Sequence, residues 1–395
     1  MPVVSRTDQA DRSGILRRLS SSLSIFTIIA VSMAIHSCYI GSKVLVSLYA
    51  LELGASQFTV GLLAAFYAIV PLMLGVYTGR LADERGMRLP LFLGSIVTAI
   101  AMLVGFGWRG LPGLFVVALL VGGGFVFFNV SVQTLAGGMG GPEHRTRNFA
   151  WLSIGYSGSS LIGPVFAGFS IDHLGHAVTF LLFSFLPLLP IGILVFKPQI
   201  TRTRKVIAAP TPGTTLDLLK DERLRKLIVI SGLSVASAEL FAFYVPVFAH
   251  QIGHSASTIG IILGSYACAI VLTRFMLGKM MKHLTVEQIM VWFLLLAAAA
   301  FAVFPFLRSA YALMATAFTI GIGVGVTQPL LMSISYERSP AGRAGEVTGL
   351  RLTVNNMARV SMPVICGALG AALGASPVFW MNAVNLVATS FLSRR

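Results

Sequence analysis

Apolar stretches of about twenty residues recur along this sequence from one end to the other. A stretch of that length, folded as a helix, crosses a hydrocarbon layer of roughly 30 Å. Twelve such stretches are present, at residues 24–50, 58–79, 88–108, 112–137, 148–171, 177–197, 226–249, 257–280, 287–307, 310–334, 346–371 and 376–393. Because only 11% of the residues are charged and the mean hydropathy is +0.84, we predict an all-α integral membrane protein with twelve transmembrane helices.

The basic residues predict how the chain is oriented. Nearly all of them fall in the terminal segments and in every second loop, whereas the other loops hold only Arg109 and Arg308. Because short loops rich in lysine and arginine stay on the cytoplasmic side, we expect both termini in the cytoplasm of a multi-pass inner (plasma) membrane protein. The formal net charge of +15 is divided among these short segments, so the lipid bilayer and not nucleic acid is the expected partner.

Cysteine and histidine placement argues against catalytic or metal chemistry. Cys38, Cys268 and Cys366 lie far apart within predicted helices and have no paired spacing. A membrane enzyme would need a nucleophile with a base, or a set of metal ligands. No predicted helix carries a histidine and a carboxylate at helical spacing within the membrane. We therefore expect no enzyme activity, no metal site and no cofactor.

The two halves of the sequence repeat with a constant shift of 199 positions. Matched pairs include Gly54 with Gly253, Ser56 with Ser255, Tyr67 with Tyr266, Arg109 with Arg308 and Pro164 with Pro363. Such a repeat indicates two units of the same topology. We predict a six-helix bundle at residues 1–197, a cytoplasmic linker at 198–225 and a second six-helix bundle at 226–395. In transporters built from two such units, the substrate site lies between them near the middle of the membrane.

The loop after the second predicted helix reads GRLADERGMR, residues 79–88. It resembles the G-x-L-A-D-x-x-G-x-R signature loop of the major facilitator superfamily, with Gly79, Asp83, Gly86 and Arg88 matching and Glu84 departing from the usual basic residue. The resemblance implies the major facilitator fold, with this loop as a conformational latch. Glycines allow a tight turn, and Asp83 can lie against a helix N-terminus or an arginine when the cytoplasmic side is closed.

A second stretch, GYSGSSLIGPVFAGFSID at residues 155–172, resembles the fifth-helix motif of the proton-coupled drug exporters in that superfamily. Gly155, Gly163, Pro164 and Gly168 match the motif. Small residues let helices approach closely and proline interrupts the backbone hydrogen bonds, so this helix is expected to pack tightly and bend. Simple helix packing explains the same residues. The intramembrane arginine common in the fourth helix of these exporters is absent, because apolar residues occupy its place in the stretch 116–124.

Glu239 is the one acid that lies deep within a predicted helix. An ionisable side chain at the bilayer centre costs about 2.5 to 3.5 kcal/mol, so it usually faces a cavity and has a partner or a function. His36, Tyr39 and Lys43 share one face of the first helix, and the repeat places Lys43 about one turn outward of the level of Glu239. We predict a Lys43–Glu239 ion pair across a central cavity, with Glu239 and His36 in proton coupling; a purely structural salt bridge is the alternative.

A polar stripe lies in the stretch RLTVNNMAR, where Arg351, Asn355 and Arg359 recur every four residues. Arg351 is close enough to the end of its helix to reach the cytoplasmic interface, but Arg359 lies roughly 20 Å from the helix start. Arg359 and Lys43 then outnumber the acid in the cavity, which suits a substrate carboxylate, phosphate or sulfonate. Lys43, Arg359, Tyr39 and Asn355 are therefore candidate substrate-binding residues.

Three amide side chains extend this candidate site. Asn129 and Gln133 belong to the fourth predicted helix and Gln328 to the tenth, and Asn129 and Gln328 are equivalent under the repeat. They are candidates to hydrogen-bond the substrate, and hydrogen bonds between helices are the alternative.

These features predict a secondary active transporter that works by alternating access and exports a small amphipathic or anionic organic compound in a proton-coupled manner. Protonation of Glu239 and substrate binding are expected to compete for the same cation, which is one way to obtain antiport. Proton-coupled uptake of an organic anion is the alternative within transport. A non-transporting membrane ligand sensor is the alternative from another class, since it would keep the cavity charges but not need the Asp83 latch. We expect a small-molecule substrate, protons and the bilayer as partners of a monomer.

Overall fold

The computed structural model describes residues 6–139, 144–196, 215–340 and 343–394. Within these ranges the side chains of 6–24, 76, 80, 82–84, 145–146, 215–216, 336–337 and 344–346, Asp83 among them, lie outside the description. Throughout the described part the chain is helical, and no strand occurs there. The helices are α1 (Arg6–Glu52), α2 (Gln57–Arg85), α3 (Arg88–Gly107), α4 (Leu111–Gly138), α5 (Arg145–Phe185), α6 (Leu188–Phe196), α7 (Glu222–Gln251), α8 (Ala256–Met280), α9 (Val286–Val303), α10 (Ala310–Gly325), α11 (Thr327–Glu337), α12 (Ala344–Leu373) and α13 (Ala375–Leu392).

Twelve membrane crossings account for these helices. Ten segments are long and apolar enough to span a membrane, and one of them is the 50-residue segment Arg147–Phe196. Gly175 has a φ of 78° inside α5, which divides that segment into two crossings. α10 and α11 together form one interrupted crossing, and the 18-residue α13 completes the set. The predicted all-α membrane fold is confirmed, and the helix count agrees with twelve crossings.

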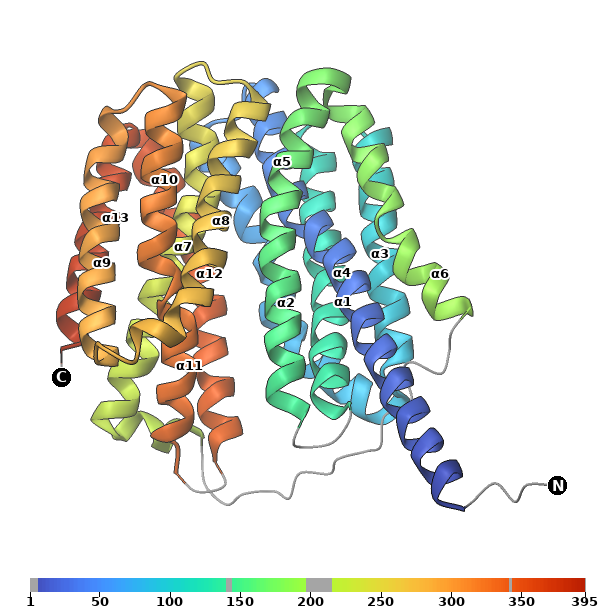
Figure 1. The fold of residues 1–395 in the computed structure, drawn as a ribbon. Coiled ribbons are helices and arrows are strands. Elements are labelled where there is room, and N and C mark those ends of the chain that lie inside the picture. The colour runs from blue at the N-terminus through green and yellow to red at the C-terminus, as the bar shows by residue number, and fades with distance from the viewer. Residues whose placement is uncertain (1–5, 140–143, 197–214, 341–342, 395) are drawn as a thin grey trace.

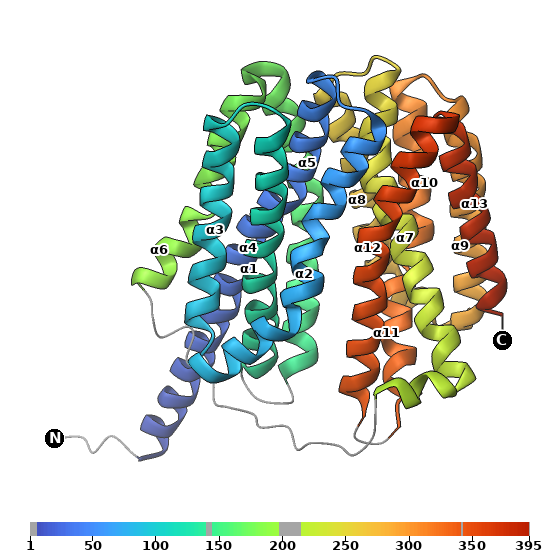
Figure 2. The same cartoon turned by 180° about the vertical axis from the view of Figure 1, so that it is seen from behind.

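The helices gather in two groups that stand side by side, α1 to α6 and α7 to α13 (Figure 1). The groups meet at the end away from the chain termini, which we call the outer end. They diverge toward the end where α1 begins and α13 ends, the inner end, as the reverse view also shows (Figure 2). Contacts between the groups run mainly along α5 with α8 and α2 with α12. The two groups are therefore in contact at the outer end and separated at the inner end.

Equivalent positions of the sequence repeat adopt the same backbone conformation. Gly54 and Gly253 follow the first helix of each half with φ values of 78° and 89°, a region that side chains with a Cβ rarely adopt. Ser56 and Ser255 then cap the N-termini of α2 and α8, each accepting from the backbone N–H three residues on. The repeat is therefore present in local structure as well as in sequence.

The helix-five motif packs against both groups. A Cβ on Gly155 or Gly163 would lie 2.9 Å or 2.7 Å from atoms of α1, and one on Gly168 would collide with the carbonyl oxygen of Ala256 at the start of α8. Pro164 lies inside α5, and its carbonyl oxygen packs against α8. Close helix packing thus accounts for these residues in this conformation, and a role specific to exporters stays a prediction.

The predicted latch loop forms one tight turn, at Gly86, which ends α2 with a φ of 83°. Gly79 lies within α2 and takes no part in that turn. Arg88 begins α3, and its Nη2 donates a hydrogen bond of 3.2 Å to the carbonyl oxygen of Leu194 in α6. Because the side chain of Asp83 lies outside the described residues, its function as a latch stays a prediction.

Candidate functional site

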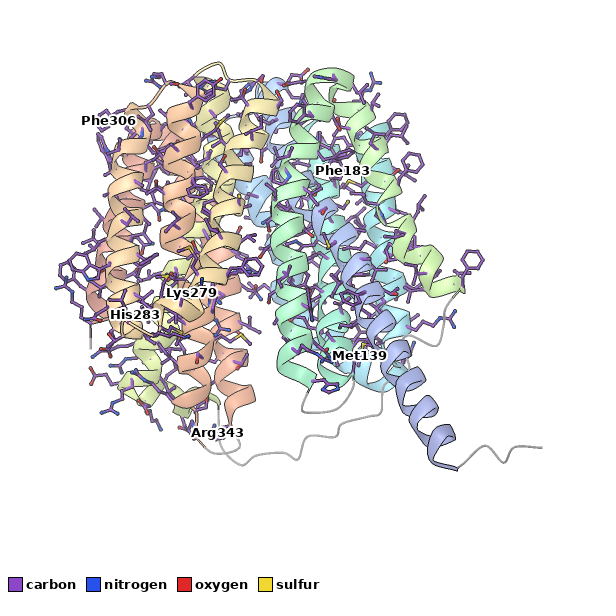
Figure 3. All side chains as sticks on the ribbon, in the orientation of Figure 1. Met139, Phe183, Lys279, His283, Phe306 and Arg343 are labelled. Atoms are coloured by element: carbon purple, nitrogen blue, oxygen red, sulfur yellow. The ribbon has the colours of Figure 1, made fainter. Side chains whose placement is uncertain are left out.

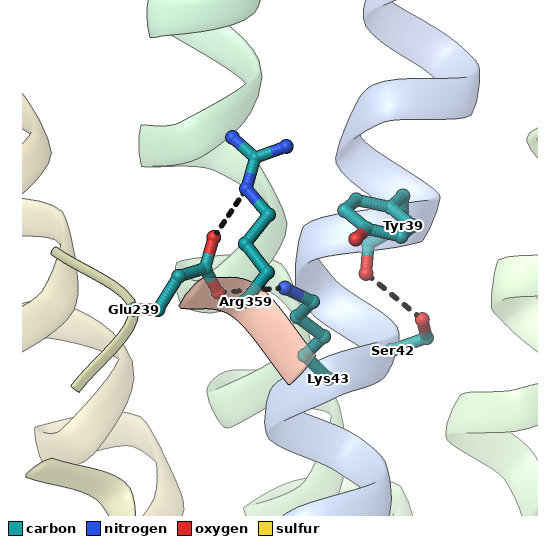
Figure 4. Close-up of polar contacts among 5 residues, drawn as sticks. All are labelled: Tyr39, Ser42, Lys43, Glu239 and Arg359. Carbon is teal, nitrogen blue, oxygen red and sulfur yellow. Dashed lines mark hydrogen bonds and ion pairs between the residues drawn. The ribbon is translucent and has the colours of Figure 1, made fainter. Parts of the chain in front are cut away.

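Glu239 of α7 lies between two cations in the space where the two groups of helices meet (Figure 4). Its Oε2 accepts a hydrogen bond of 3.2 Å from Lys43 Nζ of α1, and its Oε1 is 3.1 Å from Arg359 Nε of α12. The Lys43–Glu239 ion pair predicted from the sequence is present. Glu239 uses both carboxylate oxygens and joins one helix of the first group to two of the second.

The guanidinium of Arg359 is only partly engaged by this contact. Its Nε faces Glu239, while its two terminal nitrogens point away from the carboxylate (Figure 4). The Arg359 side chain is 43% exposed, compared with 19% for Lys43 and 18% for Glu239. A guanidinium presents its donors as a planar fork that matches a carboxylate or phosphate. Arg359 is therefore the cation of the cluster whose two terminal nitrogens are not taken up by Glu239.

Aromatic rings line the α1 side of the cluster. Lys43 Nζ lies 4.9 Å from the ring centroid of Tyr39, which stacks on Phe125 at 3.9 Å. The His36 ring lies 4.7 Å from that of Tyr156, and its Nδ1 is buried without a hydrogen-bond partner among the described residues. Tyr39 thus adjoins the charges, whereas His36 lies one turn further toward the inner end among aromatic rings. The function of His36 in proton coupling stays a prediction.

A second polar group surrounds Arg351 of α12. Its Nη1 donates hydrogen bonds to Gln328 Oε1 at 3.2 Å and to Ser231 Oγ at 3.4 Å, and Ser231 Oγ lies 3.0 Å from the side-chain amide of Asn355. Arg351 is only 5% exposed, so its side chain is packed inside the bundle and does not extend into solvent at the inner end. Gln328 and Asn355 therefore contact neighbouring helices in this conformation, and substrate binding by them stays a prediction.

The first group contains a polar pair at the positions that correspond to Asn355 and Gln328 under the repeat. The Tyr156 hydroxyl donates a hydrogen bond of 2.7 Å to Asn129 Oδ1. Under the repeat, Tyr156 and Asn129 correspond to Asn355 and Gln328, so each half places a polar pair at the same level. Gln133 lies one turn beyond Asn129 on α4 and is exposed.

Arg274 of α8 is a half-buried cation that was not among the predicted site residues. Its Nη1 donates a hydrogen bond of 2.7 Å to Ser157 Oγ of α5, across the two groups. It lies six residues before the end of α8, about 9 Å at 1.5 Å per residue, and a single arginine within the apolar stretch 257–280 was the available signal. Among the described side chains away from the ends of the membrane crossings, four cations (Lys43, Arg274, Arg351 and Arg359) accompany the one acid Glu239.

Asp172 closes the outer end by a contact between the groups. Its Oδ1 and Oδ2 accept hydrogen bonds from the backbone N–H groups of Ala256 at 3.0 Å and Ser257 at 2.8 Å, so an acid of α5 caps the N-terminus of α8. Tyr244 of α7 also donates a hydrogen bond of 2.6 Å to Gln57 of α2. These contacts stabilise a conformation that is closed at the outer end.

Asp172→Ala is expected to favour opening of the outer end. Loss of this cap removes about 1 kcal/mol from the outer-closed conformation, which shifts the populations roughly fivefold. Spin labels at the exposed positions Leu53 and Tyr311, in a variant lacking the exposed Cys268, should report longer distances. Glu52→Ala is the matched control, because Glu52 pairs with His176 within the first group. Equal distance distributions in both variants would contradict the closing function of Asp172.

Two six-crossing groups, a charge cluster between them and an outer end held closed define a multi-pass membrane transporter. The chain belongs to the Major Facilitator Superfamily, whose family model matches residues 19–363. It is therefore a transporter of small molecules and not an enzyme.

Relatives agree with this assignment, and solved structures share the fold. The chain is similar to the quinolone resistance protein NorA of Staphylococcus aureus, 24% identical over 355 residues that cover 86% of this chain and 87% of the relative. It is also similar to the multidrug resistance protein MdtG of Salmonella paratyphi A, 24% identical over 336 residues that cover 78% and 77%. A peptide transporter POT in complex with sulfate superposes with a TM-score of 0.76 at 15% identity, covering 94% of this chain and 93% of that one. A bacterial homolog of the human lysosomal transporter Spinster, inward-facing and unoccupied, gives 0.72 at 13% identity and 94% of each chain.

Proposed function

We propose that this protein exports a small amphipathic or anionic organic compound by alternating access, coupled to protons through Glu239. The observation that carries this proposal is the single carboxylate of Glu239 between Lys43 and Arg359, with the Arg359 fork turned away from it. Relatives named for drug resistance support export, because export is the direction that lowers an internal drug concentration. The protein is proposed to act as a monomer in the inner membrane, with both termini in the cytoplasm and residues 1–197 and 226–395 as the moving units.

The charge balance supports an acidic group on the substrate. Lys43 and Arg359 share one carboxylate, and Arg274 and Arg351 have only neutral hydrogen-bond partners among the described side chains. Bringing an anion into such a site compensates charge that the protein itself leaves uncompensated. An amphipathic compound with a carboxylate, phosphate or sulfonate and an apolar body would also fit the aromatic wall beside Lys43.

A second function, uptake of an organic anion together with a proton, is favoured by the bridging geometry itself. Glu239 holds both cations while it is ionised, so its protonation releases Arg359 and Lys43 to an anion. Proton and anion then bind together, which is the order needed for symport. A substrate whose own N–H or O–H group donates to the ionised Glu239 excludes the proton instead, and this is the order needed for antiport and export.

Proton movement during binding distinguishes the two functions. Purified full-length protein is first screened by thermal shift against organic anions, lipophilic cations and neutral drugs at two pH values. The best ligand is then added to weakly buffered protein with a pH indicator. Release of protons supports export in exchange for protons, and uptake of protons supports anion symport. Stabilisation by lipophilic cations or neutral drugs that persists in Lys43→Met would contradict an anionic substrate.

A further inference from the structure

A cavity lies at the inner end of the second group, apart from the Glu239 cluster. It has a volume of about 290 Å³ and is lined by residues at the inner ends of α7, α9, α11 and α13. This volume is nearly ten times the ~30 Å³ that a water molecule takes in the liquid, so a much larger group fits. None of the residues that line it belongs to the Glu239 cluster or to the group around Arg351.

The wall of this cavity is apolar and well packed. Leu227 and Ile230 of α7, Met290 of α9 and Leu331 of α11 line it, and each is at most 6% exposed. Ile334 extends the apolar wall by one turn of α11 toward the inner end. Apolar surface that still faces the cavity comes from Leu392 of α13, which is 37% exposed, and from the partly exposed Val286 and Ile334, so an apolar group gains by covering it.

The rim of the same cavity is basic. Arg223, Lys226 and Arg338 line it, with Glu287 as the one acid. Lys226 Nζ is 2.5 Å from Glu222 Oε1 on the same helix, so its charge is already paired. Arg223 and Arg338 are then the basic residues that can bind an anion in the cavity. Both are exposed, and neither makes an ion pair in the part of the chain that the structure describes. Two guanidinium groups beside an apolar wall suit a phosphate that is attached to an apolar chain.

The location of the cavity identifies the source of such a group. α9 and α13 present large apolar side chains outward, with Trp292 66% and Val384 68% exposed, as expected for helices that face the bilayer. Lys279 and His283 lie at the inner end near the start of α9, so further basic groups adjoin this region (Figure 3). The cavity thus lies where the headgroups of the inner-end leaflet meet the protein, and a lipid reaches it more readily than a soluble phosphate.

We propose that this cavity is a binding site for an anionic phospholipid, whose phosphate binds Arg223 and Arg338 and whose upper acyl chain lies against the apolar wall. α7 also carries Glu239, and α11 begins next to Gln328, so a bound lipid contacts two helices that carry the candidate transport site. The lipid site does not rest on the transport function proposed above, because none of its residues contributes to that function.

Lipid retention by the full-length protein tests this proposal. Purified wild-type protein and the double variant Arg223→Gln/Arg338→Gln are titrated with dioleoyl phosphatidylglycerol, and bound lipid is counted by native mass spectrometry. Each arginine near an anionic lipid surface contributes about 1 kcal/mol to binding. Because about 1.4 kcal/mol corresponds to a tenfold change in affinity, loss of both arginines is expected to weaken the tightest binding about 30-fold. The matched control Arg225→Gln/Lys282→Gln removes two exposed charges at the same end that do not line the cavity, and wild-type affinity is expected.

Two further ligands and one variant separate the alternatives. Dioleoyl phosphatidylcholine, which has no net charge, should bind weakly, and glycerol 1-phosphate should bind weakly because it has no acyl chain. Ile334→Trp should fill the apolar wall and reduce phosphatidylglycerol binding with both arginines in place. Equal losses of phosphatidylglycerol affinity in the two double variants would show that the lipid binds to diffuse surface charge and would overturn the proposed site. Binding of glycerol 1-phosphate as tight as that of the lipid would replace the lipid by a soluble phosphate.

Discussion

Glu239→Gln is expected to abolish accumulation of substrate driven by a pH gradient, while exchange of labelled for unlabelled substrate without a gradient continues. The reason is that glutamine keeps the size and the hydrogen-bonding capacity of glutamate but cannot take up and release a proton. Proteoliposomes with an imposed pH gradient measure the first activity, and counterflow in the same vesicles measures the second.

If the second proposed function, anion symport, holds, the same variant binds an organic anion more tightly near neutral pH. The Glu239 carboxylate lies 3.2 Å from Lys43 Nζ and 3.1 Å from Arg359 Nε, so removal of its charge leaves both cations without a carboxylate. A hydrogen bond to a charged group contributes about 1.5 to 3 kcal/mol, so a gain of roughly tenfold in anion affinity is expected. In this variant, anion affinity should also stay constant over the pH range in which Glu239 changes its protonation state in the wild type.

Two exposed acids at the ends of the helices provide the controls for Glu239. Glu52→Gln at the outer end and Glu287→Gln at the inner end remove the same charge outside the cluster, and both should keep gradient-driven transport. Uphill transport by Glu239→Gln at the wild-type rate would exclude Glu239 as the coupling group. The ion pair with Lys43 would then be structural, which is the alternative left open by the sequence.

The sequence predicted the fold because the membrane restricts it so strongly. Every apolar stretch of sufficient length becomes a helix when no water is available to the backbone. The basic loops predict the orientation of these helices, and the repeat predicts their division into two halves. Breaks within crossings were harder to place. Gly175 was included in a loop between two separate helices, whereas α5 continues through it as one kinked segment. The division between α10 and α11 at Val326 directly follows Gly325 and lies three residues before Pro329. Proline removes a backbone donor, so the sequence carried a signal for this break that the prediction of one helix at 310–334 did not use.

The candidate site was only partly accessible from sequence. The contact of Lys43 with Glu239 followed from the repeat, which brings equivalent levels of α1 and α7 together. The polar stripe of Arg351, Asn355 and Arg359 placed Arg359 in the same cavity, but a stripe does not specify which group Arg359 contacts, and its approach to Glu239 depends on how α12 packs against α7. Arg274 and Arg351 illustrate the same limit. Position along a helix indicated their depth, but only packing showed that Ser157 and Gln328 are their partners.

Arg359→Gln is expected to weaken binding of an organic anion about 10- to 100-fold, the second large effect. The substitution keeps a polar side chain at a position that is 43% exposed, but it removes the positive charge and the planar set of donors of the guanidinium. One charge-assisted contact of about 1.5 to 3 kcal/mol corresponds to this range. Arg359→Lys should fall between wild type and Arg359→Gln, because it keeps a point charge without the paired donors. Titration of the purified variants with the anion selected by thermal shift provides the affinities.

Combining Arg359→Gln with Glu239→Gln shows how the two residues depend on each other. In the single variant Arg359→Gln, Glu239 keeps Lys43 as its only partner and repels an anion, so the loss of affinity includes that repulsion. In the double variant the repulsion is gone, and Lys43 alone is expected to restore part of the affinity, which makes the two changes non-additive. Arg308→Gln, at the outer end, should leave affinity unchanged. Wild-type anion affinity in Arg359→Gln, together with additive effects in the double variant, would remove Arg359 from the substrate site and leave it as a structural partner of Glu239.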